Sequence, residues 1–173
     1  IYFMFGFSYV IYFTFIIAYL TKEIGLTPGS AGHIFAIVGF FSIFSGIIWG
    51  GISDVLGRRY GSMFAYVILA ACNIIAAFWT DSAGFYLSAA MFGLSFSAIP
   101  TIMAAAVGDQ TGGRSAPAAL GFITLFFGIG QAFGPAVAGL IKDSTGTFVY
   151  SFIVAAVVSM AGSFGSLILR KKA

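Results

Sequence analysis

The chain has 173 residues, of which 60% are apolar and only 8% are charged, with eight Lys or Arg and five Asp or Glu. A soluble domain carries about a quarter charged residues, so these side chains are too few to cover a water-facing surface. The composition excludes an ordinary soluble enzyme, a disordered chain and a nucleic-acid binder. It indicates an integral membrane protein whose main contact is the lipid bilayer.

Turn residues and charges divide the chain into six apolar stretches, each long enough to cross the bilayer as a helix. The predicted spans are residues 1–20, 31–52, 62–78, 85–107, 118–141 and 148–169. Runs of this kind do not alternate as the strands of a membrane barrel do, so the sequence predicts an all-α fold. The polar segment 108–117 is expected to be a loop. Because Ile1 already lies within an apolar run, we expect the chain to be part of a longer protein.

The distribution of Lys and Arg predicts the orientation in the membrane. The segments after spans two and four and the tail hold six of them: Arg58, Arg59, Arg114, Arg170, Lys171 and Lys172. The opposite side holds only Lys22 and Lys142. By the positive-inside rule, both ends of this six-span unit are expected to be cytoplasmic.

An internal repeat appears when the chain is shifted by 89 residues against itself. The pattern Gly50-x-Ile52-x-Asp54-x-x-Gly57 then falls on Gly139-x-Ile141-x-Asp143-x-x-Gly146, and Pro28 falls on Pro117. The shift covers three spans, so the second copy is upside down in the membrane. The sequence therefore predicts one six-helix bundle over residues 1–173, built from two inverted repeats at 1–80 and 81–173, an arrangement typical of secondary transporters.

Small residues and prolines inside the spans predict where helices pack closely or bend. Gly39 and Gly46 lie on one face of span two, and Gly130 and Gly134 form a small-xxx-small pair in span five. Pro100 and Pro135 each remove a backbone donor and allow a bend.

One segment resembles a known family signature. Gly50-Gly51-Ile52-Ser53-Asp54-Val55-Leu56-Gly57-Arg58-Arg59 is similar to the loop between the second and third helices of a half in the major facilitator superfamily. The family positions fall on Gly50, Asp54, Gly57, Arg58 and Arg59, while Val55 replaces a usual Arg. The resemblance implies half of a twelve-helix fold, the carboxyl-terminal half, in which this loop latches one conformation of the transport cycle.

The resemblance also implies that the first helix of each triplet lines the central cavity. The polar residues of spans one, four and five that we expect there are Ser8, Tyr9, Tyr12, Ser97, Thr101, Thr124 and Gln131. Two alternatives stay open at these positions. Each hydroxyl can instead bond to a carbonyl of its own helix, and each tyrosine can serve aromatic packing.

These features predict a secondary active transporter, a symporter or an antiporter, that moves a small solute by alternating access. The spans hold no charge, so any charged partner of the solute is expected in the other half. The cavity face is expected to be rich in aromatic and hydroxyl side chains, which suits a small organic acid or a drug-like compound. We expect no enzyme activity, no cofactor and no metal site, and we expect the other six-helix half of the same protein as partner. The predicted location is the cytoplasmic (inner) membrane of a bacterium. The alternative is a six-helix channel or membrane scaffold that works as a homodimer.

Overall fold

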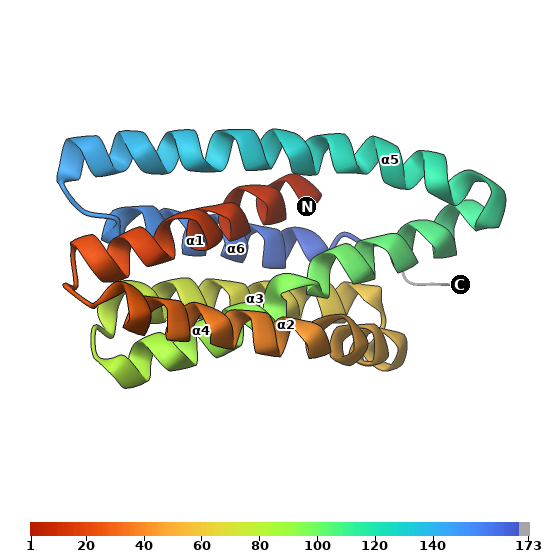
Figure 1. Ribbon diagram of the computed structural model, residues 1–173. Helices are drawn as coiled ribbons and strands as arrows, with labels where there is room; N and C mark the ends of the chain where they lie inside the picture. The colour runs from red at the N-terminus through yellow and green to blue at the C-terminus, as the bar shows by residue number, and fades with distance from the viewer. Residues whose placement is uncertain (170–173) are drawn as a thin grey trace.

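The computed structural model describes residues 1–169, and all regular structure in this part of the chain is helical. The helices are α1 (Tyr2–Lys22), α2 (Pro28–Leu56), α3 (Arg58–Phe78), α4 (Ser82–Phe96), α5 (Ala98–Thr145) and α6 (Val149–Ser166). Figure 1 shows them side by side, with α5 folded back into two arms. Six helical stretches of this region are long and apolar enough to cross a membrane. The predicted all-α, six-span fold is confirmed.

The helix labels and the spans differ in one respect, because α4 and the first arm of α5 together form span four, Ser82–Gly112. The second arm, Arg114–Thr145, forms span five. The two arms meet at Gly112, which has φ 72° and ψ 164°. A positive φ is accessible to glycine without steric cost, so one residue reverses the chain.

The prediction of a loop over residues 108–117 is therefore wrong, since the chain is helical on both sides of Gly112. The charges and glycines of this segment indicate a loop when they are taken together, but a single left-handed residue makes the turn. The basic tail used for the orientation, Arg170, Lys171 and Lys172, lies outside the described residues.

Other connections between helices are also short, and side-chain hydrogen bonds cap some of the helices that follow them. Gly57 alone separates α2 from α3 and has φ 90°. The Thr27 hydroxyl accepts a hydrogen bond from the Ser30 N–H at 3.2 Å and caps α2. Asp81 caps α4 in the same way, accepting from the Gly84 N–H at 2.9 Å. Tight connections of this kind keep neighbouring helices antiparallel and close.

Burial is uneven among the spans. In the apolar stretch of α1, 50% of the residues are buried inside the bundle, and in that of α3 the share is 56%. The corresponding shares are 22% for α2 and 11% for the second arm of α5. These two spans therefore present broad faces to the outside of the bundle.

Glycines bring α1 and the second arm of α5 into backbone contact. A Cβ on Gly130 would collide with the Phe3 carbonyl oxygen, and one on Gly134 would lie 2.6 Å from the Phe7 carbonyl oxygen. Gly6 of α1 meets the Phe127 carbonyl in the same manner. Without a hydrophobic force between helices in lipid, such close backbone approach is a main source of association.

This contact predicts a position-specific cost of adding one methyl group. Gly130→Ala should destabilise the chain by about 1–3 kcal/mol, because the added carbon overpacks the contact with α1. Gly128→Ala is the control, since Gly128 lies two residues earlier on the same helix with no atom within 4 Å of its Cβ position. Thermal unfolding of the purified chain in detergent measures both, and equal melting temperatures for the two variants would contradict the packing.

Candidate functional site

Two residues predicted for the cavity meet between α1 and the second arm of α5. The Gln131 Nε2 atom donates a hydrogen bond to the Tyr9 hydroxyl at 2.8 Å, and both side chains are half-buried. The amide keeps a second N–H and the hydroxyl keeps its own hydrogen. The pair therefore retains donors that a ligand with an acceptor group can use.

Aromatic rings surround this pair. Phe5 and Phe127 stack on Tyr9 with ring centroids 5.0 and 5.8 Å away, and Phe96 meets its edge at 5.7 Å. Offset and edge contacts of this kind fix the ring of Tyr9 and surround its hydroxyl with apolar surface. The Tyr9–Gln131 pair is thus a hydrogen-bonding group surrounded by aromatic rings.

Two other predicted cavity residues lie in the interior of this half. The Tyr12 hydroxyl shares a hydrogen bond of 2.8 Å with the Ser88 hydroxyl, which donates in turn to the Cys72 carbonyl at 2.8 Å. Tyr12 is fully buried and stacks on Phe92 at 4.1 Å. Ser8, also fully buried, donates to the Met4 carbonyl of its own helix at 2.7 Å.

The remaining predicted cavity residues lie on the two arms of α5 and at its start. Ser97 is the residue between α4 and α5, and Thr101 follows one turn later; both are half-buried. Thr124 is exposed on the second arm and donates to the Leu120 carbonyl of its own helix at 2.7 Å. The structure thus brings Tyr9 and Gln131 together and leaves Thr124 separate from them.

Two of the signature residues, Asp54 and Arg58, belong to a polar cluster where α2 turns into α3. Arg58 pairs with Asp54 one turn before it and with Asp109 near the end of the first arm of α5, at 2.5 and 3.0 Å. It also donates to the Ser53 hydroxyl at 2.7 Å. We call Ser53, Asp54, Arg58 and Asp109 the Arg58 cluster. It ties the turn between α2 and α3 to span four.

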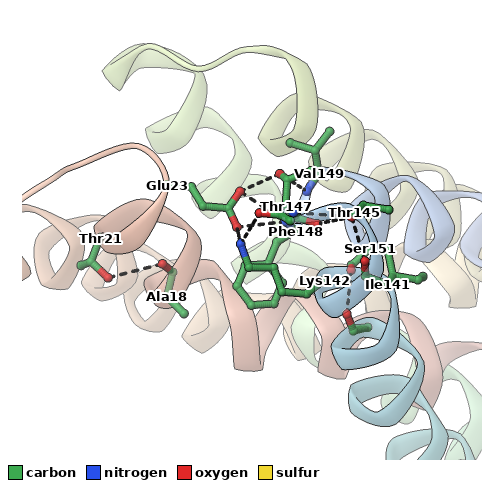
Figure 2. Close-up of polar contacts among 12 residues, drawn as sticks. Ala18, Thr21, Glu23, Ile141, Lys142, Thr145, Thr147, Phe148, Val149 and Ser151 are labelled. Atoms are coloured by element: carbon green, nitrogen blue, oxygen red, sulfur yellow. Dashed lines mark hydrogen bonds and ion pairs between the residues drawn. The ribbon is translucent and has the colours of Figure 1, made fainter.

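A second polar cluster, at the opposite end of the bundle, involves residues that the sequence did not single out. Figure 2 shows the Glu23 carboxylate, just after α1, facing Lys142 and the start of α6. It accepts from Lys142 Nζ at 2.6 Å, from the Thr147 hydroxyl at 2.6 Å and from the Phe148 N–H at 3.0 Å. We call these four residues the Glu23 cluster.

The surroundings of Glu23 shift its titration. Burial alone would raise the pKa of this carboxyl, but the hydrogen bonds from Lys142, Thr147 and the Phe148 N–H outweigh it and lower the pKa below its ordinary value of 4.5. An anion at a helix N-terminus is also favoured by the exposed N–H groups there. Glu23 is thus held charged and serves as a fixed tie between α1, α5 and α6.

Sequence reasoning singled out Asp54 and Arg58 but missed Glu23, Lys142 and Asp109, for different reasons. Glu23 and Lys142 are 119 residues apart, and each follows a predicted span in an ordinary polar stretch of the sequence. Asp109 lay within the segment expected to be a loop. The available signal was that Glu23 and Lys142 are opposite charges at the same predicted membrane face. Within residues 1–169, no three His, Cys, Asp or Glu side chains gather as a metal-binding group.

The comparison with known families agrees with the fold. The sequence model of the Major Facilitator Superfamily matches residues 1–173. The chain belongs to this superfamily.

Relatives with known names are similar at moderate identity. An Agrobacterium vitis protein named for tartrate transport is 28% identical over 164 residues, covering 89% of this chain and 36% of the relative. Human monocarboxylate transporter 2 is 24% identical over 151 residues, covering 85% of this chain and 32% of the relative. Human monocarboxylate transporter 6 is 28% identical over 151 residues, covering 79% and 29%. The chain thus spans about a third of the length of these relatives.

The Glu23 cluster makes a pH-dependent contribution to stability. Because the folded-state pKa is lowered, the contribution is complete above 4.5 and is lost as pH falls through the lowered value. Glu23→Gln should cost about 1–2 kcal/mol near neutral pH, the loss of charge-assisted hydrogen bonds at a partly exposed site.

Thermal melts between acid and neutral pH measure this effect. The variant should lose part of the acid dependence seen in the parent. Asp143→Asn, an exposed acid next to Lys142, is the control and should melt as the parent does. An unchanged pH profile in Glu23→Gln would show that the cluster contributes no stability.

Proposed function

We propose that this chain is one six-helix half of a secondary transporter, the carboxyl-terminal half by the sequence prediction, that moves a small organic acid by alternating access. The observation that carries the proposal is the Tyr9–Gln131 pair, a polar point with spare donors in a charge-free, aromatic setting. The family supplies the class of activity. Alternating access, the solute and the second half are our own inferences.

The partner of this half is a second bundle of six helices in the same protein. Two features favour it: the low burial of α2 and of the second arm of α5, and the length of the relatives. Glycines on these two spans have open space at their Cβ positions, among them Gly39 and Gly128. Large apolar side chains such as Ile47 and Leu125 lie exposed on the same two spans. A face of this kind suits a closely packed helix from a second bundle.

The two inverted repeats support alternating access. Under the 89-residue shift, α1 corresponds to span four and α2 to span five. The glycine contacts follow the same relation, because α1 meets span five through Gly130 and span four meets α2 through Gly93, whose Cβ position lies 2.6 Å from the Val38 carbonyl oxygen. Inverted three-helix repeats of this kind are typical of transporters in which one repeat or bundle rocks against the other around a central site.

An organic acid is the solute class that fits the site and the relatives together. The described spans carry charges only near helix ends, so the acceptor groups of a solute meet N–H and O–H donors of uncharged side chains in this half. The relatives are named for tartrate and monocarboxylate transport. We also propose the bacterial cytoplasmic membrane as the location, with both ends of the half on the cytoplasmic side.

Uptake by the full-length protein in proteoliposomes tests the proposal, with labelled lactate and tartrate as probes. Tyr9→Phe and Gln131→Leu should each raise KM about fivefold to tenfold, the cost of one lost hydrogen bond to the solute. Tyr86→Phe removes the hydroxyl of an exposed tyrosine on α4 and is the control. A protein that carries only a strongly polar sugar, or neither acid, would overturn the proposal.

A further inference from the structure

Span four is broken in the middle of its apolar stretch. α4 ends at Phe96, α5 begins at Ala98, and Ser97 between them has φ −100° and ψ 1°. Pro100 follows within the first turn of α5 and has no N–H to give to the preceding turn. In the bilayer core, backbone groups released by such a break need partners from the protein itself, since water is absent.

Two side chains of α2 supply partners at this break. Ser45 Oγ and Trp49 Nε1 both donate to the Leu94 carbonyl, at 2.6 and 2.8 Å. The Ser45 hydroxyl also accepts from the Ser97 N–H at 3.0 Å, so it bridges the two sides of the break. Both side chains are buried, and their spacing of four residues places them on one face of α2. We call Ser45 and Trp49 the α2 clamp.

Residues predicted for the solute path lie directly beside the clamp. The backbone N–H of Ser97 donates a hydrogen bond to the Ser45 hydroxyl, and Thr101 lies one turn further along span four. The Cβ position of Gly46 lies 3.4 Å from Thr101 Oγ1 and 4.0 Å from Ser97 Cβ. The glycine at position 46 of α2 therefore lies against Ser97 and Thr101. The side chains of Ser45 and Trp49 hydrogen-bond the backbone of span four just before these two residues.

We propose that Ser45 and Trp49 are positioning residues, which hold the break of span four against α2 and thereby set how Ser97 and Thr101 face the solute path. A shift of α2 along or away from span four changes the bend, because both donors end on one carbonyl. This inference rests on the proposed transport function, since it assigns the clamp to a solute path. The family resemblance and the relatives' names assign no role to either residue.

Thiol labelling tests the clamp without a known solute. Thr101→Cys is placed in the full-length protein in membrane vesicles and treated with a membrane-impermeant maleimide. The native Cys72 is fully buried and gives the unlabelled background. Ser45→Ala, which removes two hydrogen bonds, or Trp49→Phe, which removes one, is then added. Each should change the labelling rate of the thiol at position 101 at least about fivefold, as expected for loss of at least one buried hydrogen bond.

Ser95→Ala is the matched control for these variants. Ser95 is as buried as Ser45 and lies next to Leu94, but its hydroxyl donates to the Met91 carbonyl of its own helix at 3.0 Å. It should leave the labelling rate within about twofold, because it deletes the same group without touching α2. Trp49→Phe keeps one aromatic ring and removes the N–H donor together with the rest of the indole, so it tests the clamp even where Ser45→Ala fails to fold.

The outcomes separate the clamp from the transport function. Clamp variants that label as the Ser95→Ala control does, or a thiol at position 101 that stays unlabelled in the parent, would overturn the clamp even if organic acids are carried. A changed rate in both clamp variants supports the clamp. If that change appears in a protein that carries no organic acid, the proposed function is overturned while the tie between α2 and span four stands.

Discussion

The absence of water in the bilayer core is the constraint on which the rest of this structure depends. Each backbone donor or acceptor left without a partner there costs several kcal/mol, so the chain crosses as helices and meets its interruptions with its own side chains. The charges lie near helix ends, where the Arg58 and Glu23 clusters each join three segments of the chain. Where span four breaks, the side chains of Ser45 and Trp49 in α2 donate hydrogen bonds to the Leu94 carbonyl.

The same constraint shapes how the helical bundle holds together. Helices in lipid gain little from hydrophobic burial against one another, so glycine contacts such as Gly130 on Phe3 carry the packing. They hold α1 firmly on the second arm of α5, the two helices that supply Tyr9 and Gln131. This packing lies behind the uncharged Tyr9–Gln131 pair that we propose as part of the solute site.

The spans and the family were predictable because apolar length and the spacing Gly50, Asp54, Gly57, Arg58, Arg59 are local properties of the sequence. The Tyr9–Gln131 pair was predictable only as two separate residues, since their contact depends on packing over 122 positions. The turn at Gly112 was missed because its backbone angles do not follow from composition. Glu23 and Ser45 were missed because each acts on a backbone or a charge far along the chain, which no local pattern indicates.

The most direct test of the central claim is a cryo-electron microscopy structure of the full-length protein with a bound organic acid. The account predicts an acceptor group of the ligand within about 3 Å of Tyr9 and Gln131, and a second helical bundle covering α2 and the second arm of α5. Ligand density away from this pair, with those two helix faces exposed to lipid, would contradict it.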